Sequence, residues 1–168
     1  MRAEAKAQAA PRIEHGSDLI VVQKLTQRPV TPSAARLRIW AGAALHAVHT
    51  RRKPVGLTLR LVGRAESRTL NRQWRQKDKP TNVLSFPDGE SHDENGVLGL
   101  GDIVICAPVV NAEAREQGKA ATAHWAHMVV HGVMHLLGYD HVRDRDARRM
   151  EAREVEILSS FGYSNPYQ

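Results

Sequence analysis

The sequence predicts a single domain of the α+β or α/β class, in which helices pack on a sheet. The chain has 168 residues, 42% of them hydrophobic, so it can bury a core without disulfide bonds. Segments with strand-like and helix-like periodicity follow one another in mixed order along the chain. The sequence shows no internal repeat and no low-complexity linker that would divide it into further domains.

The N-terminal segment, residues 1–16, is Ala-rich and has no clear period, so we expect a flexible extension before one domain at residues 17–168. Residues 1–10 lack the apolar stretch of a signal peptide. No run of the chain approaches the roughly 20 apolar residues that a membrane span requires. The single cysteine, Cys106, excludes a disulfide framework. We therefore expect a cytoplasmic protein with no membrane partner and a buried Cys106.

In the first part of the domain, the sequence predicts two strands and two helices. Asp18–Leu25 (DLIVVQKL) has the composition of a strand. Thr31-Pro32 predicts a helix start, because Thr caps helices and Pro suits the first turn. Apolar side chains then share one helical face, at Leu37, Trp40, Ala41, Ala44 and Val48. Alternation over Val55–Val62 predicts the second strand, and residues 64–75 predict the second helix.

In the middle of the chain, the sequence predicts two strands joined by a polar loop. A short strand at Val83–Phe86 runs into the turn signal Pro87-Asp88-Gly89. Residues 88–99 are acidic and contain glycine, so we expect an exposed loop or hairpin there. Leu100–Cys106 (LGDIVIC) predicts the next strand.

Three helices are expected in the C-terminal part, at residues 108–118, 122–138 and about 144–161. Pro108 suits the first turn of the first of them, and Thr122 opens the second. A glycine closes each helix in turn, at Gly118, Gly138 and Gly162.

The most informative cluster is formed by histidines. Four of the nine histidines fall between His124 and His135, and His141 follows closely. His131 and His135 are four residues apart, so both project from one side of a helix and can reach one metal ion. A turn at Gly138 lets His141 fill a third position. Three neutral imidazoles and a water are typical of an open, catalytic zinc site, so we expect one Zn²⁺ here.

Spacing alone leaves a second pairing open, because His127 lies four residues before His131. Only the glycine turn and the third histidine favour the later trio. We expect His124 and His127 to pack in the core or to support the ligands, and Asp140 to orient a ligand histidine or relay a proton. Imidazole also suits nickel, copper and iron, so the spacing does not fix the metal.

Residues 131–141 (HGVMHLLGYDH) match the outline H-x-x-x-H-x-x-G-x-x-H of zinc peptidases with three histidines. Those enzymes place a glutamate directly after the first histidine as their general base. Gly132 occupies that position here. The motif therefore supports a metal site and argues against peptide hydrolysis.

Positive charge is concentrated in one segment. The formal net charge is +6, yet residues 51–79 contain ten Lys or Arg against two acidic residues, so this segment alone carries +8. Such a segment fits a docking surface for a polyanion, with nucleic acid the first choice. The alternative is a merely solvated charged face.

Within this segment, four arginines share one face of the expected helix at Arg64, Arg68, Arg72 and Arg75. Guanidinium groups in such a stripe can track phosphates. We expect Trp74 to join the core with Leu70 rather than to stack on bases. The following stretch, residues 75–87, adds cations and the polar side chains Thr81, Asn82 and Ser85, which can bond phosphate or sugar. Alternatively, residues 75–87 are only a polar loop with a small strand behind it.

Three stretches carry a family resemblance, residues 71–87 (NRQWRQKDKPTNVLSFP), 98–106 (LGLGDIVIC) and 127–141 (HMVVHGVMHLLGYDH). Together they resemble the YbeY family of bacterial single-strand-specific endoribonucleases, which act in ribosomal RNA maturation. The resemblance is good over roughly residues 60–168 and holds only in pattern before that. Asn82 stands where many relatives are expected to have Asp.

The resemblance implies a small mixed, mostly parallel sheet flanked by helices. It implies His131, His135 and His141 as ligands of one Zn²⁺, and Arg75 as the basic catalytic residue. It further implies single-stranded RNA as substrate, processing of the 16S rRNA 3′ end, a role in ribosome quality control, and association with the small ribosomal subunit and its assembly factors.

The mechanism we expect is metal-dependent cleavage of single-stranded RNA. Zinc would polarise a phosphate oxygen or lower the pKa of its water, and Arg75 would stabilise the developing charge. RNA would enter along the basic side chains Arg64, Arg68, Arg72 and Lys77. Asp140, a ribose hydroxyl and metal-bound hydroxide remain open as the general base. The rival functions are a non-catalytic zinc-containing ribosome assembly factor and a zinc peptidase.

Overall fold

The computed structural model describes residues 18–26, 29–48, 53–89 and 92–168, so the expected extension at residues 1–16 lies outside the described part. Within these ranges the chain forms four strands and five helices in mixed order. The strands are β1 (Leu19–Lys24), β2 (Val55–Val62), β3 (Val83–Pro87) and β4 (Leu98–Cys106). The helices are α1 (Ala34–Val48), α2 (Arg64–Arg75), α3 (Ala107–Glu116), α4 (Ala121–Leu136) and α5 (Asp144–Ser159).

The four strands form one sheet in the order β1-β2-β4-β3. The strands β1, β2 and β4 are parallel to one another, and β3 runs antiparallel to β4 at the edge. This confirms the expected α+β domain with a mixed, mostly parallel sheet. Side chains on β2 alternate between buried and half-buried over most of the strand, because successive residues point to opposite faces.

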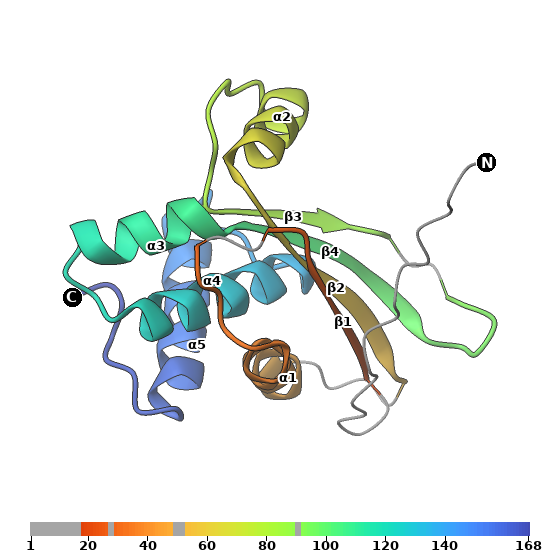
Figure 1. Ribbon diagram of the computed structural model, residues 1–168. Helices are drawn as coiled ribbons and strands as arrows, with labels where there is room; N and C mark the ends of the chain where they lie inside the picture. Colours follow the sequence, from red (N-terminus) through yellow and green to blue (C-terminus); the bar gives the residue numbers. More distant parts are fainter. Residues whose placement is uncertain (1–17, 27–28, 49–52, 90–91) are drawn as a thin grey trace, which may run out of the picture.

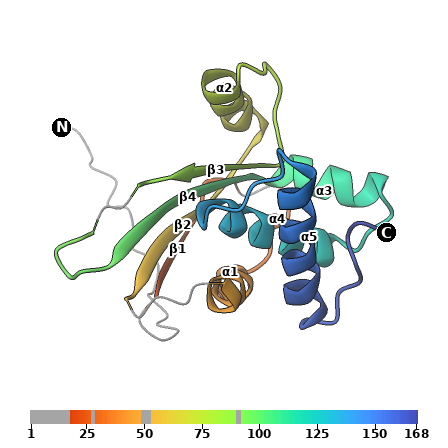
Figure 2. The same ribbon diagram turned by 180° about the vertical axis from the view of Figure 1, so that it is seen from behind.

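The helices cover the two faces of the sheet unequally. Figure 1 and Figure 2 show α1 and α4 on one face, α5 packed beside α4, and α2 on the other side of the sheet. The main core fills the space between the sheet and α1 and α4, and includes Leu59, Ile103, Ile105, Val129 and Val133. A smaller cluster lies toward α2 and comprises Val62, Leu84, Val104 and Cys106. Cys106 is therefore buried, as expected.

Most element boundaries agree with the sequence prediction, and the exceptions have local causes. Helix α1 begins at Ala34 rather than at Thr31, because the Ser33 hydroxyl accepts a hydrogen bond from the Arg36 amide at 3.2 Å and caps the helix. Strand β4 begins at Leu98, two residues earlier than expected. Strands β3 and β4 pair antiparallel, and residues 88–89 and 92–96 of the expected hairpin between them are exposed.

Gly101 is required by the pairing of β3 with β4. Its φ is +125°, which side-chain-bearing residues rarely adopt, and a Cβ there would collide with the Phe86 carbonyl oxygen. The register between β2 and β4 shifts next to it, between Gly56 and Leu57. The shift leaves one extra residue on β4, Leu100, as in a β-bulge.

Trp74 does not join the core, and this expectation was wrong. Its side chain is 63% exposed and meets Phe86 of β3 edge-on, with ring centroids 5.7 Å apart. The reason is that the buried residues of α2 are polar: Ser67 and Asn71 face inward and hold the following loop. Only Leu70 of the expected pair packs, half-buried, against the smaller apolar cluster.

Candidate metal centre

The site is built at the end of α4. His131 and His135 lie one helical turn apart, and Gly138 ends the helix with a φ of +87°. The Gly138 amide donates to the His135 carbonyl at 3.0 Å, which closes the last turn. The chain then turns back and brings the His141 ring to 5.0 Å from the ring of His135, measured between centroids.

The structure thus brings the predicted trio together. The ligand nitrogens of His131, His135 and His141 all lie within 4.8 Å of one another. The first two side chains are half-buried and the third is exposed, so this group is open to solvent on one side. Openness is what a metal that binds a substrate requires.

Hydrogen bonds fix which ring nitrogens face the common point. His131 Nδ1 donates to Glu154 Oε1 at 2.7 Å, and His135 Nδ1 donates to the Tyr139 carbonyl at 3.0 Å. Both acceptors lack a proton, so each Nδ1 carries the hydrogen, and in the neutral form of both rings each Nε2 keeps its lone pair. The two Nε2 atoms lie 3.0 Å apart. Two lone pairs at that distance repel unless a cation lies against both, so the donor set fits a metal ion such as zinc.

The electrostatics of the site also suit a metal. Burial, together with the nearby rings of His131 and His141, lowers the pKa of His135 below its usual value, so its ring is neutral at pH 7. Burial alone would raise the pKa of Glu154. Hydrogen bonds from His127 and His131 outweigh this effect and bring the pKa to about 2. Neutral imidazoles backed by a charged carboxylate are good metal ligands.

A second group, His127, His131 and Glu154, also has its ligand atoms within 4.8 Å. It differs from the trio because it is enclosed: Glu154 is 0% exposed and His127 only 8%. Glu154 also accepts a hydrogen bond from the Tyr167 hydroxyl. In the structure the His127 ring faces a buried carboxylate, whereas the trio of His131, His135 and His141 is open to solvent; the ligand atoms of both groups are close enough to hold a metal ion.

His124 is buried as expected, against a different carboxylate. Its Nε2 lies 2.8 Å from Glu113, which also accepts from the Asn82 side-chain amide at 3.2 Å. Burial raises the pKa of Glu113, but the hydrogen bonds from His124 and Asn82 outweigh it and hold the pKa below its usual value. Asn82, directly before β3, therefore links this strand to α3, and its amide donates to Glu113 as an ionised carboxylate could not.

Gly132 lies on the side of α4 that faces the sheet. A Cβ at this position would be 2.6 Å from Ile103 Cγ2, and its carbonyl accepts from the Ser85 hydroxyl at 3.0 Å. A side chain here would enter the core against β4 and could not reach the open side of the histidine trio. The structure therefore agrees that the general base of a zinc peptidase has no place at this position.

The basic stripe lies on the exposed side of α2. All four of its arginines are exposed, and so is the next predicted RNA-binding residue, Lys77. Arg68 is engaged internally, because its guanidinium donates two hydrogen bonds to Asp78, at 2.8 and 2.7 Å. Arg72 lies 4.0 Å from the same carboxylate. Arg75, the last residue of α2, has no carboxylate partner among the described residues.

The loop after α2 has a fixed shape. Gln76 caps the helix in the left-handed region, with a φ of 58°. The Ser67 hydroxyl donates to the Thr81 carbonyl at 2.9 Å, and the Asn71 amide donates to the Lys79 carbonyl at 2.7 Å. These bonds define where Arg75 and the cations after it are presented.

The structure places beside His131 a carboxylate that the sequence analysis did not name. Asp140 was the expected residue, but its Oδ1 accepts from the His141 backbone amide at 2.7 Å and from no imidazole in the described structure. The carboxylate that bonds the His131 ring is Glu154. A signal was present, because Glu154 falls on the apolar face of its helix with Met150 and Leu158.

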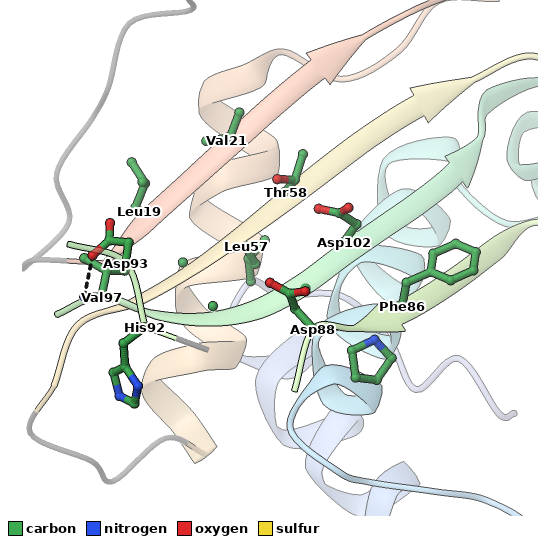
Figure 3. A pocket seen from close by; sticks show the side chains of 14 residues that line it. Leu19, Val21, Leu57, Thr58, Phe86, Asp88, His92, Asp93, Val97 and Asp102 are labelled. Atoms are coloured by element: carbon green, nitrogen blue, oxygen red, sulfur yellow. Dashed lines mark hydrogen bonds between the residues drawn. The ribbon is translucent and has the colours of Figure 1, made fainter. Parts of the chain in front are cut away.

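A separate hollow of about 460 Å³ lies on the sheet face that α1 does not cover (Figure 3). Its lining includes Asp88, Asp93 and Asp102, and it includes none of the predicted site residues. Phosphates are repelled by such a surface, so an RNA backbone fits the basic stripe better than this hollow.

Comparison with known proteins decides the family. The family model described as "Endoribonuclease YbeY" matches residues 23–162. The chain belongs to the YbeY endoribonuclease family. The match begins well before residue 60, so the N-terminal part that resembled the family only in pattern is included. Membership confirms the enzyme class expected from the sequence, an endoribonuclease.

Individual relatives agree with this assignment. The chain is 52% identical over 136 residues to "Endoribonuclease YbeY" of Pseudomonas syringae pv. syringae (strain B728a), covering 81% of this chain and 80% of the relative. The protein of the same name from Stutzerimonas stutzeri (strain A1501) is 52% identical, with 81% and 83% covered. The solution structure of TM1509 from Thermotoga maritima shares the fold, with a TM-score of 0.55, 24% identity, and 89% and 99% of the two chains covered. None of the helices in the described part is long and apolar enough to cross a membrane.

Proposed function

We propose that this member of the YbeY family is a zinc-dependent hydrolase that cuts single-stranded RNA. Its expected cellular task is maturation of ribosomal RNA, with processing of the 16S rRNA 3′ end and ribosome quality control. The small ribosomal subunit and its assembly factors are the proposed partners. Family membership supports the RNA substrate, and the histidine trio supports the metal.

The observation that carries this proposal is the arrangement of His131, His135 and His141 around one open point. These three side chains would hold one Zn²⁺, each through a ring nitrogen. Bound zinc supplies Lewis-acid polarisation of a phosphodiester. The protein keeps the His131 and His135 rings oriented for that purpose through hydrogen bonds to Glu154 and the Tyr139 carbonyl.

Arg75 is proposed to stabilise the negative charge that develops on the phosphate during cleavage. The exposed guanidinium at the end of α2 has no carboxylate partner among the described residues, so its hydrogen-bond donors are available to a substrate. Arg64, Arg72 and Lys77 would guide the strand along the same surface. Arg68 would contribute less, because Asp78 already occupies its guanidinium.

Asp140 is the carboxylate that we propose as proton acceptor near the metal. It is exposed beside His141, and only its Oδ1 is engaged, by the His141 backbone amide. The second carboxylate oxygen faces no donor in the part of the chain that the structure describes. A carboxylate placed in this way can take a proton from a substrate hydroxyl or from water.

The test is metal removal followed by zinc addition. Labelled single-stranded RNA is incubated with chelator-treated protein, with the same protein after addition of one equivalent of Zn²⁺, and with a duplex of the same sequence as the control substrate. We expect cleavage only with zinc, and only of the single strand. Zinc-loaded protein that binds the RNA without cutting it, either free or in ribosomal particles, would support the assembly-factor function instead.

A further inference from the structure

Glu154 is an unusual member of the core. It lies on α5 between Met150 and Leu158, which both pack in the main core, and its side chain is 0% exposed. Moving a charged carboxylate from water into the core is unfavourable unless hydrogen bonds compensate for the lost hydration. Packing of α5 in the core therefore does not explain why a carboxylate occupies this position.

Three donors converge on this carboxylate, two from α4 and one from the C-terminal segment. His131 Nδ1 lies 2.7 Å from Oε1, and His127 Nε2 lies 3.2 Å from Oε2. The Tyr167 hydroxyl donates to Oε2. The shorter of the two imidazole contacts is the one to His131, a predicted metal ligand. Of the described carboxylates, this is the one that bonds an imidazole of the trio.

The C-terminal segment closes this arrangement from outside. The Tyr167 ring stands edge-on to the His127 ring, with centroids 5.3 Å apart. The Lys119 ammonium donates to the Pro166 carbonyl at 2.6 Å and holds the segment against the turn before α4. Tyr167 is thereby kept over Glu154, and water is kept from the carboxylate.

We propose that Glu154 is a positioning residue for metal binding: it holds the His131 ring so that Nε2 faces the open side of the trio. Tyr167 acts one step further out, by fixing the carboxylate through its hydroxyl. The inference rests on the proposed metal site, in which His131 is a ligand. A carboxylate bonded to the far nitrogen of a ligand imidazole sets its tautomer and orientation and makes it a better ligand.

The first test measures zinc affinity by competition with a chelating dye, using the full chain. Glu154→Gln keeps the size of the side chain and removes its charge. We expect it to weaken zinc binding by about 10- to 100-fold. Glu156→Gln on the same helix is the matched control, because Glu156 is exposed and pairs with Arg153, and this variant should bind zinc as the wild type does. The zinc affinity of Tyr167→Phe should lie between those of Glu154→Gln and Glu156→Gln.

A purely structural role predicts a different result. In that case Glu154→Gln would lower the midpoint of thermal unfolding of the zinc-free protein, while the folded fraction would bind zinc with wild-type affinity, and the proposal would be overturned. Wild-type protein that binds no zinc would instead refute the metal site itself. The two failures are thus distinguishable.

A second measurement needs no variant and applies even if Glu154→Gln does not fold. In the zinc-loaded wild-type protein, long-range ¹H–¹⁵N NMR spectra report the proton on each histidine ring. We expect the His131 Nδ1 proton to be far downfield and protected from exchange with water, because it is bonded to a buried carboxylate. Rapid exchange of that proton would overturn the proposal.

Discussion

The Nε2 atoms of His131 and His135 lie 3.0 Å apart at the end of α4. Each ring has its Nδ1 bonded to a protein acceptor, Glu154 in one case and the Tyr139 carbonyl in the other. When both rings are neutral, two lone pairs face each other at this distance, which is unfavourable in the absence of a cation. This relationship links the fold to the proposed chemistry, because a metal ion removes the repulsion.

The first prediction concerns pH. Burial and the nearby histidine rings lower the pKa of His135 below its usual 6.5, so at any given pH a smaller fraction of this ring should be protonated than of an ordinary histidine. Protons should therefore compete with zinc at this nitrogen less than at an ordinary histidine. The ring chemical shifts of His135 in zinc-free protein, followed against pH, give the midpoint. A midpoint above pH 6.5 would contradict the account.

The second prediction separates catalysis from folding at Arg75. Arg75→Ala should lower the turnover of single-stranded RNA about 10²- to 10³-fold, as expected when a group that stabilises transition-state charge is removed. Zinc content should stay unchanged, since Arg75 lies outside the histidine trio. Arg115→Ala, an exposed arginine on α3, serves as the control and should keep wild-type turnover. Loss of zinc in Arg75→Ala would show that the residue is structural.

The third prediction concerns the strength of RNA binding in salt. Each phosphate contact to a single strand contributes a slope of about 0.7 to the fall of log affinity with log salt. Arg72→Ala should reduce the slope more than Arg68→Ala, because two hydrogen bonds to Asp78 already occupy Arg68. Fluorescence anisotropy with a labelled single strand measures both slopes. Equal slopes for the two variants would show that the ion pair opens when RNA binds.

The fourth prediction tests the environment of Asn82. Asn82→Asp would place a second carboxylate about where the amide now lies, 3.2 Å from Glu113. It should lower the free energy of unfolding at pH 7 by about 1–3 kcal/mol, the cost of losing a buried hydrogen bond. The loss should shrink near pH 4, because protonation of either carboxylate removes the repulsion. Urea unfolding at both pH values measures it, with Asn95→Asp in the exposed hairpin as control.

Local patterns were sufficient for the parts of the fold that depend on local chemistry. The alternation over Val55–Val62 and the helix at Arg64–Arg75 match the structure at both ends. The turn at Gly138 places His141 beside the two helical histidines, because a left-handed residue ends the helix there. These features follow from the side-chain period and from glycine, and both can be seen in the sequence.

Contacts between distant segments could not be predicted in the same way. The stripe of arginines was expected from its helical spacing, but the pairing of Arg68 with Asp78 depends on how the next loop folds back. Trp74 was placed in the core because it is large and apolar, yet α2 covers the sheet with Ser67 and Asn71 instead. Glu154 reaches His131 across the interface of α4 and α5, and periodicity within one helix gives no such partner.

The central claim is that the histidine trio holds the metal with which this protein cuts RNA. It is tested most directly by the cleavage of a labelled single-stranded RNA by zinc-loaded wild type and by His135→Ala, purified identically, with zinc content measured in both. We predict that the wild type contains one zinc ion and cleaves the strand, and that His135→Ala has lost both properties. Equal cleavage by the two proteins would contradict the account, because the activity would then come from elsewhere.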